Sequence, residues 1–262
     1  MNELLEIQKA GPVLTLTLNR PDKRNALNAE LVSALSRALN EAADDETVRV
    51  LVLTGAGSVF SAGADLDALQ RMQEASAAEN LADSERLAKL FEQIYRHPKP
   101  VIAKINGHAI AGGCGLAAVS DFSIAAEGAK LGFTEVRIGF VPAIVSVFTL
   151  RKLGETVARE LLLRGALITA ETAADIGLIT RTVPADQLDE TVDRLAAEIA
   201  SNTSGTAVAL TKRLLANVSG MGLKEALSYA TQLNAFARGT EDCRAGIEAF
   251  LNKTDPPWKR GM

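Results

Sequence analysis

The feature that most constrains this fold is an apolar run that leads through a turn and a row of small residues into a helix. Val101–Ile105 has the β-branched composition of a buried strand, and Asn106-Gly107 is a turn signal. Residues 111–115 are small, and a helix-compatible segment, 116–119, follows. Small residues let another molecule approach the backbone, and a helix start offers unpaired N–H groups with partial positive charge. The arrangement suits an oxygen that gains negative charge during a reaction.

A second segment upstream has the same design. Residues 48–54 form another apolar run, and residues 55–64 form a loop of mostly small side chains. A helix start is expected at Asp65-Leu66. Two loops of this kind can each direct one backbone N–H toward the same oxygen. A further apolar run at 122–126 follows the first helix start and leads to Glu135, a carboxylate flanked by Phe133 and Val136.

Strands that alternate with helices predict stacked parallel βαβ units, so we expect an α/β core. A hairpin is expected at 3–8 and 13–19, and Asn28 is expected to cap a helix. Residues 75–80 are small and polar, which predicts a mobile segment. Further helices are predicted at 81–96, 143–150, 156–163, 170–176, 185–201, 206–218, 223–238 and 241–251. The expected division is an α/β core over 1–185 and a helical region over 186–262.

Composition excludes several classes of protein. The 262 residues are 47% hydrophobic and 23% charged, as in ordinary globular proteins. A net charge of −4 gives no basic field for nucleic acid, and no apolar run is long enough for a membrane helix. Two cysteines provide no disulfide framework, and the acidic N-terminal segment does not resemble a signal peptide. We therefore expect a cytoplasmic protein without nucleic-acid or membrane partners. A mitochondrial matrix protein without its transit peptide is the alternative.

Five motifs in series carry a family resemblance. The chain resembles the enoyl-CoA hydratase/isomerase (crotonase) superfamily, and the motifs occur in the order of that family over nearly the whole chain. Residues 133–143 are similar to bacterial short-chain enoyl-CoA and methylglutaconyl-CoA hydratases. The motifs are 19–28 (NRPDKRNALN), 61–66 (SAGADL), 106–116 (NGHAIAGGCGL), 132–139 (GFTEVRIG) and 173–179 (AADIGLI).

The resemblance implies a fold, an assembly and a substrate. The fold is the crotonase (ClpP-like) spiral of ββα repeats with a helical C-terminal trimerisation region. The expected assembly is a homotrimer or a homohexamer built as a dimer of trimers. The substrate is an acyl-CoA thioester, so coenzyme A enters as part of the substrate and no cofactor is bound permanently.

The resemblance also implies the catalytic groups. The backbone N–H groups of Ala64 and Gly112 bind the thioester oxygen, on which an enolate develops. Glu135 is the acid/base, and its apolar neighbours can raise its pKa toward neutrality. The alternative for Glu135 is an ordinary surface glutamate paired with Arg137.

One position departs from the family pattern. The first catalytic glutamate of the hydratases maps onto Gly115, so only Glu135 remains. A single carboxylate can still handle one water that supplies both the OH and the H, so an enoyl-CoA hydratase is the preferred function. It also suits a Δ3,Δ2-enoyl-CoA isomerase, which moves a proton between two carbons. A non-catalytic acyl-CoA-binding protein is a third possibility of a different class.

Other positions are expected to bind coenzyme A or to have a structural role. His108 is expected to serve packing or a turn, His97 to be solvated, and Asp121 to cap or orient the strand at 122. The histidines and cysteines are too scattered for a metal site.

The resemblance assigns coenzyme A contacts to Lys23, Arg24, Ala26, Ala62, Gly63, Asp65, Leu66 and Gly113, and, from a neighbouring subunit, to Phe250 and Lys253.

Overall fold

Stacked strand–strand–helix turns build two sheets. The computed structural model describes residues 4–260. The six-stranded sheet has the order β1-β2-β3-β5-β7-β10, and the four-stranded sheet has the order β4-β6-β8-β9. The first sheet contains β1 (Leu5–Ala10), β2 (Val13–Leu18), β3 (Val50–Gly55), β5 (Val101–Ile105), β7 (Phe122–Ala126) and β10 (Arg181–Val183). The second contains β4 (Val59–Ser61), β6 (His108–Ile110), β8 (Lys130–Gly132) and β9 (Ile168–Thr169).

Strand pairing follows a repeating rule. In the successive pairs β3/β4, β5/β6 and β7/β8, the first strand joins the larger sheet and the second joins the smaller one. Within each sheet, the strands that come from successive pairs lie side by side and are parallel. The predicted α/β spiral of ββα repeats is therefore confirmed. The predicted hairpin is also confirmed, because β1 and β2 are antiparallel. Glu3, the first residue of the predicted hairpin, lies outside the described residues.

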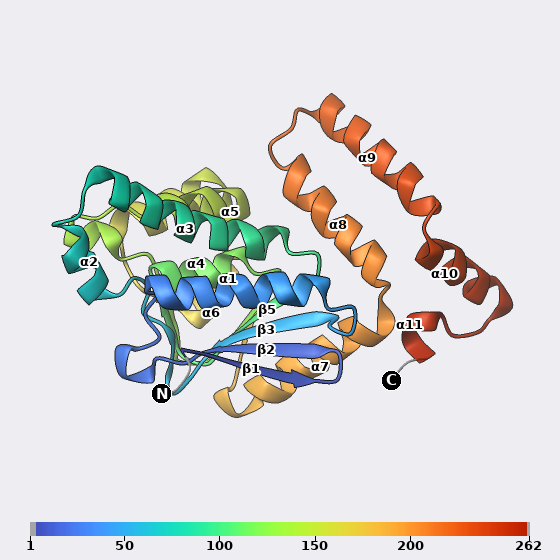
Figure 1. Ribbon diagram of the computed structural model, residues 1–262, viewed down its shortest axis with the longest axis horizontal. Coiled ribbons are helices and arrows are strands. Elements are labelled where there is room, and N and C mark those ends of the chain that lie inside the picture. The colour runs from blue at the N-terminus through green and yellow to red at the C-terminus, as the bar shows by residue number, and fades with distance from the viewer. Residues whose placement is uncertain (1–3, 261–262) are drawn as a thin grey trace.

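The larger sheet is covered on both faces. Leu51 and Leu53 of β3 pack in the main core, while Val50 and Val52 pack in a second core. This alternation follows from the two-residue period of a strand. The main core lies beneath α1 (Ala29–Asp44), α3 (Ala77–Arg96) and α4 (Gly112–Val119), and the second lies against α7 (Leu188–Asn202). Figure 1 shows α1, α3 and α4 on one side of the sheet and α7 on the other.

Capping residues decide where several helices begin. Asn28 Oδ1 accepts from Leu31 N at 2.9 Å and starts α1, as predicted. The mobility predicted for 75–80 stays a prediction, but residues 77–80 are helical, because Ser76 and Glu79 form a capping box that begins α3 at Ala77. The two helices predicted at 143–150 and 156–163 are the halves of α5 (Ala143–Arg164), which is interrupted at Gly154, where φ is +72°.

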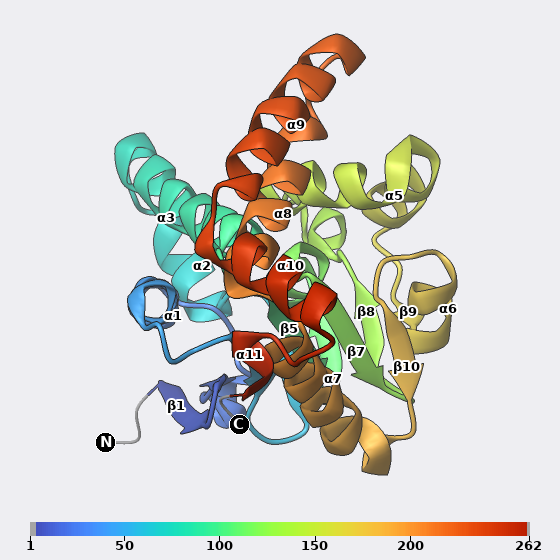
Figure 2. The same ribbon diagram turned by 90° about the vertical axis from the view of Figure 1, so that its right-hand side faces the viewer.

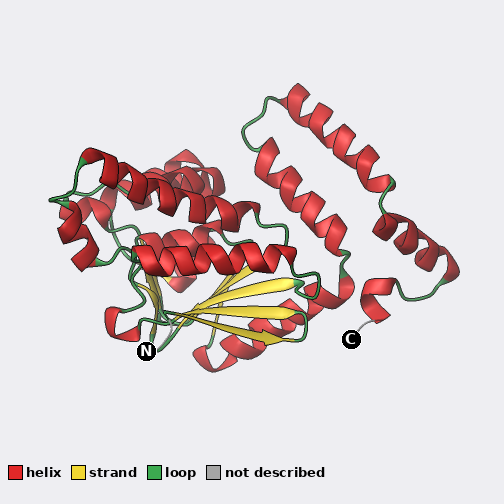
Figure 3. Cartoon of the chain, in the orientation of Figure 1, coloured by secondary structure: helices red, strands yellow, loops and turns green. Residues whose placement is uncertain are grey.

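The C-terminal part is helical, as predicted. Within residues 4–260 every element after α7 is a helix, as Figure 3 shows, and in Figures 1 and 2 α9 extends away from the sheets. The domain boundary near residue 185 stays a prediction, and α7, which follows it, packs on the large sheet. None of the helices within residues 4–260 is long and apolar enough to cross a membrane. The remaining helices are α2 (Leu66–Met72), α6 (Ala170–Asp175), α8 (Gly205–Val218), α9 (Leu223–Arg238), α10 (Glu241–Asn252) and α11 (Pro257–Arg260).

The predicted solvation of His97 is wrong. Its side chain is buried, with Nε2 3.0 Å from the Leu39 carbonyl and Nδ1 3.1 Å from the Lys99 backbone N. The loop that contains His97 packs beneath the end of α1, a contact that the local sequence does not reveal. His108, expected to serve packing or a turn, is an exposed residue of β6 whose Nδ1 accepts from the N of Lys130, the first residue of β8, at 3.1 Å. Asp121 orients the neighbouring strand as expected, accepting from Val101 N at 2.8 Å.

Candidate active site

The start of α4 presents the backbone N–H of Gly112. Ala111 N donates to Gly132 O at 2.8 Å, which holds the entry to the helix against the end of β8. Ala111 has φ +52° and ψ −122°, a rare backbone conformation for a residue with a side chain. Such strain persists where the surrounding structure imposes it, often at functional sites. Gly112 is the first residue of α4, so its N–H has no acceptor within the helix.

The loop after β4 packs directly against this helix start. A Cβ added to Gly63 would lie 2.7 Å from Ala111 Cβ and 3.0 Å from Gly112 N. A Cβ added to Gly113 would lie 2.7 Å from Ser61 Cβ. Both positions therefore require glycine, because any side chain would separate the two loops. The two small-residue loops found in the sequence are in contact, which is compatible with the prediction that each directs one backbone N–H toward the same oxygen.

Ala64 lies between two backbone hydrogen bonds that fix its peptide groups. Leu27 N donates to Gly63 O at 2.7 Å, and Asp65 N donates to Leu27 O at 3.1 Å. These bonds define a parallel bridge between Leu27 and Ala64. In such a bridge the N–H of Ala64 points away from Leu27. Within residues 4–260 this N–H has no acceptor, which leaves it available to a ligand.

Glu135 is a buried carboxylate with a free oxygen. It lies in the 3₁₀ turn Glu135–Ile138, which follows β8, and only 9% of it is exposed. Among the described residues, its Oε2 is the buried side-chain oxygen that lacks a hydrogen-bond partner. An unpaired buried polar group costs about 1–3 kcal/mol, so this arrangement needs an explanation in function.

The environment of Glu135 agrees with an acid/base role. Burial raises the pKa of its carboxyl group, the direction predicted from Phe133 and Val136. Burial of the Cys114 thiol, with a smaller contribution from the Glu135 charge, raises the pKa of Cys114 to about 12. Glu135 lies three residues after Gly132, whose carbonyl oxygen accepts from Ala111 N at 2.8 Å, so the chain enters the 3₁₀ turn of Glu135 next to the start of α4. The alternative of a surface glutamate paired with Arg137 does not fit, because Glu135 is buried and its Oε2 has no partner among the described residues.

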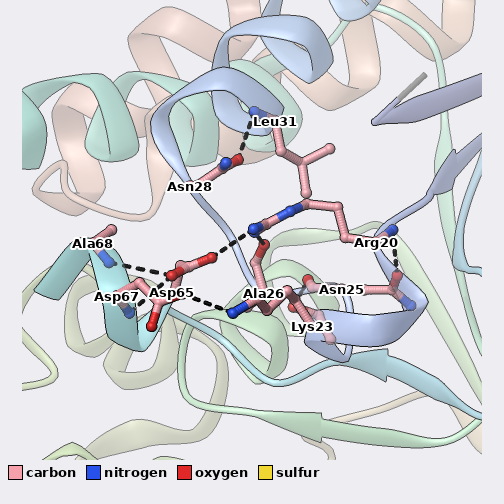
Figure 4. Close-up of polar contacts among 10 residues, drawn as sticks. Arg20, Lys23, Asn25, Ala26, Asn28, Leu31, Asp65, Asp67 and Ala68 are labelled. Carbon is pink, nitrogen blue, oxygen red and sulfur yellow. Dashed lines mark hydrogen bonds and ion pairs between the residues drawn. The ribbon is translucent and has the colours of Figure 1, made fainter. Parts of the chain in front are cut away.

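The N-terminal loop completes one face of the site. Ala62 N donates to Arg24 O at 2.9 Å, and Lys23 Nζ lies 2.7 Å from Asp67 Oδ2 (Figure 4). Lys23 and Arg24 are exposed and Ala26 is buried. Two segments that lie about forty residues apart in the sequence therefore meet beside Gly112. The structure brings together the predicted coenzyme A residues Lys23, Arg24, Ala26, Ala62, Gly63, Asp65, Leu66 and Gly113.

Two predicted residues lie apart from this group. Phe250 and Lys253 belong to the end of α10, which is on the opposite side of Figure 1 from α2. The side chain of Phe250 is 83% exposed. Within one chain these residues do not join the site, which agrees with their expected contact with a neighbouring subunit but does not test it.

Gly115 has no room for a side chain. A Cβ at this position would lie 2.7 Å from Cε1 of Phe91 and even closer to Cγ1 of Val145. Both neighbours are buried, one in α3 and the other in α5. The position of the absent first glutamate is therefore filled by packed apolar side chains.

Sequence reasoning missed two residues that shape the site. Arg20 forms an ion pair with Asp65 at 2.6 Å (Figure 4). Buried Asn25 donates through Nδ2 to Ala56 O at 2.9 Å and Val59 O at 2.7 Å. Asn25 also adopts φ +53°, a conformation in which asparagine is enriched. The sequence feature that could have pointed to Arg20 is the carboxylate of Asp65 within a loop of small residues. A buried carboxylate needs a partner, and a nearby arginine can supply one.

Comparison with known proteins agrees with this geometry. The family model for enoyl-CoA hydratase/isomerase matches residues 8–261. A Thermus thermophilus protein whose name includes "enoyl-CoA hydratase" is 44% identical over 97% of this chain and 99% of its own length. The 2,3-dehydroadipyl-CoA hydratase of Escherichia coli is 36% identical over 99% of each chain. An enoyl-CoA hydratase structure from Shewanella pealeana superposes with a TM-score of 0.92 at 31% identity, covering 98% of this chain and 96% of that one. The chain belongs to the enoyl-CoA hydratase/isomerase, or crotonase, family of enzymes.

Proposed function

We propose that this enzyme adds water to a 2-enoyl-CoA thioester and gives a 3-hydroxyacyl-CoA. One observation carries the proposal: Glu135, whose Oε2 is buried without a partner, lies three residues after Gly132, and the Gly132 carbonyl binds Ala111 N at the helix start that presents the N–H of Gly112. A buried carboxylate with a free oxygen suits the handling of a water and its proton. Full-length relatives with hydratase names support the same reaction class.

In the proposed mechanism, Glu135 carries out both proton transfers. Its carboxylate accepts a proton from water while the water oxygen forms a bond to Cβ of the substrate. The electrons of the double bond move onto the thioester oxygen as an enolate. Glu135 then returns the proton to Cα, the enolate collapses to the thioester, and the carboxylate is regenerated.

The N–H groups of Ala64 and Gly112 stabilise the enolate oxygen. Charge on this oxygen is greatest after attack, so fixed donors bind the enolate more strongly than the substrate. Each such donor contributes about 3–4 kcal/mol in enzymes where one has been removed. The partial positive charge at the start of α4 adds to this effect at Gly112.

Coenzyme A would lie along the loops beside the oxyanion groups. Lys23 and Arg24 offer charge to its phosphates, and the 62–66 backbone with Ala26 and Gly113 would surround the adenine and pantetheine. Phe250 and Lys253 would come from a neighbouring subunit, so the proposal includes a homotrimer or a homohexamer. The cytoplasmic location and the lack of nucleic-acid and membrane partners stay predictions from the sequence.

Gly115 supports a second candidate reaction. The position is closed by Phe91 and Val145, so no second carboxylate can enter there without repacking. A Δ3,Δ2-enoyl-CoA isomerase needs one group that moves a proton between two carbons, and Glu135 alone suffices for that transfer. The named relatives favour hydration, and the single carboxylate favours isomerisation.

A two-substrate assay separates these reactions. The purified protein is incubated first with crotonyl-CoA and then with a 3-enoyl-CoA, and the absorbance of the conjugated enoyl thioester is followed. Hydration predicts a loss of absorbance with crotonyl-CoA. A gain with the 3-enoyl-CoA and no loss with crotonyl-CoA would instead assign the isomerase reaction. No change with either substrate would contradict both.

A further inference from the structure

Arg20 joins the two segments that flank Ala64. Its Nη2 lies 2.6 Å from Asp65 Oδ2, and its Nη1 donates to Ala26 O at 2.5 Å (Figure 4). The side chains of Arg20 and Asp65 are only 12% and 5% exposed. A planar guanidinium with two donors fixes both acceptors in one geometry, which an exposed and mobile ion pair cannot do.

Asp65 is fixed on its other side as well. Its Oδ1 accepts from Asp67 N at 2.9 Å and from Ala68 N at 3.2 Å, which caps α2. Burial disfavours the charged form, but the hydrogen bonds from Arg20 and Ala68 outweigh burial and hold the pKa of Asp65 below its usual value. Asp65 is therefore an anion with all its partners in place, one residue after Ala64.

These contacts bracket the peptide groups of Ala64. The bonds of Leu27 to Gly63 and Asp65 set the orientation of the Ala64 N–H. Arg20 binds Ala26, the residue before Leu27, and Asp65, the residue after Ala64. One side chain therefore anchors both strands of the bridge between Leu27 and Ala64. Removing the guanidinium takes away the side-chain link between the two strands and leaves the backbone bridge and the Asp65 cap of α2.

Charge gives the pair a second effect. An unpaired carboxylate next to Ala64 would repel the negative charge that develops on the thioester oxygen. The guanidinium of Arg20 offsets that charge at a distance of 2.6 Å. The pair therefore keeps an anionic helix cap next to an oxyanion donor without opposing its function.

We propose that Arg20, through its buried ion pair with Asp65, is a positioning residue that orients the Ala64 N–H toward the enolate oxygen. The inference rests on the proposed function, because the oxygen to be bound is that of an acyl-CoA thioester. The inference extends the oxyanion-binding group beyond its two backbone donors by one residue, which does not itself contact the substrate. Its effect is expected on transition-state stabilisation more than on binding of coenzyme A.

The test measures polarisation of the bound carbonyl. Butyryl-CoA labelled with ¹³C at the thioester carbonyl cannot be hydrated, and its carbonyl stretch in infrared difference spectra falls when the oxygen accepts hydrogen bonds. The full-length protein, Arg20→Met, Asp65→Asn and Arg20→Lys are compared, together with kcat and KM for crotonyl-CoA. Lys212→Met is the control, because buried Lys212 pairs with the more exposed Asp121 in another ion pair, beyond the other end of α4.

The expected results separate positioning from general stability. Arg20→Met and Asp65→Asn should lose part of the carbonyl shift, with kcat falling about 10- to 100-fold and KM changing less than about threefold. Arg20→Lys keeps a cation beside Asp65 and should recover part of both losses. Lys212→Met should lower the melting temperature and leave the carbonyl shift unchanged.

Several results would overturn the inference. A wild-type carbonyl shift in folded Arg20→Met would do so, and if that variant fails to fold, the same result in Asp65→Asn would. No recovery in Arg20→Lys would exclude the role of the ion pair. The infrared measurement needs binding alone, so it tests the pair even if crotonyl-CoA is not hydrated, whereas that failure would count against the proposed function.

Discussion

Glu135 shows how a single residue can trade stability for function. Its carboxylate is buried, one oxygen lacks a partner, and burial raises its pKa. A group with a raised pKa in the folded state contributes most stability when it is protonated. That contribution is lost as the pH rises from the ordinary pKa of glutamate through the raised value. Above that raised value the fold therefore carries a carboxylate that weakens it.

Replacing Glu135 should strengthen the fold at neutral pH. Glu135→Gln has the same shape and no charge, so its free energy of unfolding at pH 8 should exceed that of the wild type by about 1 kcal/mol. The advantage should disappear near pH 4, where the wild-type carboxyl group is protonated in both states. Urea unfolding at the two pH values measures this difference in the free energy of unfolding, and Glu127→Gln at an exposed position is the control. A lower stability of Glu135→Gln at pH 8 would contradict the account of the buried charge.

Gly115 should tolerate no side chain. Gly115→Ala should lower the free energy of unfolding by about 1–3 kcal/mol, because its Cβ would overlap Phe91 and Val145. Gly115→Glu should be worse and should not increase hydration. Urea titrations measure both variants against Gly220→Ala, whose Cβ would lie 3.6 Å from Arg151. A stable Gly115→Glu with a higher kcat would show that the pocket can accept the second carboxylate.

Residues whose role depends on local sequence could be predicted, and residues whose role depends on distant contacts could not. The apolar neighbours of Glu135 indicated its raised pKa, and small residues located both helix starts. Arg20 and Asp65 lie 45 residues apart, so their pairing appears only in the folded chain. His97 lies between polar residues and prolines in the sequence, and its burial comes from α1.

At the scale of elements, the contact between α1 and the loop after α3 depends on one neutral histidine. His97 bonds to the Leu39 carbonyl and accepts from Lys99 N, so protonation at Nδ1 would remove the acceptor for Lys99 N. Burial lowers the pKa of His97, and the nearby cations Lys212 and Lys99 act in the same direction. A lowered pKa in the folded state means that stability falls as the pH drops below the ordinary histidine value.

The melting temperature should show this dependence. Between about pH 7.5 and 5.5 the wild type should lose stability as the unfolded chain takes up a proton at His97 near its ordinary pKa of about 6.5. His97→Gln should be less stable at pH 7.5 and should show a shallower decline. Differential scanning fluorimetry across this range measures the two slopes. Equal slopes would show that His97 does not govern the acid sensitivity.

Element boundaries followed from the sequence wherever a cap or periodicity marked them. The C-terminal helices and α1 were predicted closely, because amphipathic repeats and caps are local signals. The start of α3 was missed, since Ser76 and Glu79 were not identified as a capping box. The division of strands between two sheets required the resemblance, because short β4, β6 and β8 carry little pattern of their own.

At the scale of the molecule, the C-terminal helices expose an apolar surface on α9 and α10. Leu223, Leu227 and Phe236 of α9 are 78%, 59% and 64% exposed, and no residue of this helix is buried. Ile247, Phe250 and Leu251 of α10 are also exposed. Apolar surfaces of this extent commonly mark subunit contacts, which supports the proposed trimer.

The oligomer proposal predicts a mass. Light scattering should give about three or six times the subunit mass of 27.7 kDa. Leu227→Asp combined with Phe236→Asp should shift the protein toward the monomer, because charged groups are costly in a buried interface. Ile7→Asp on the outer strand β1 is the control and should leave the mass unchanged. A wild-type monomer would contradict the proposed contribution of Phe250 and Lys253 to a neighbouring site.

The most direct test of the central claim is the rate of crotonyl-CoA hydration by Glu135→Gln. The variant should bind butyryl-CoA like the wild type and melt at the same or a higher temperature. Its kcat should fall by at least about 100-fold, as expected when a general acid/base is removed. Glu127→Gln should keep the wild-type rate. Near-normal turnover by folded Glu135→Gln would remove this carboxylate from the mechanism and with it the proposed chemistry of the site.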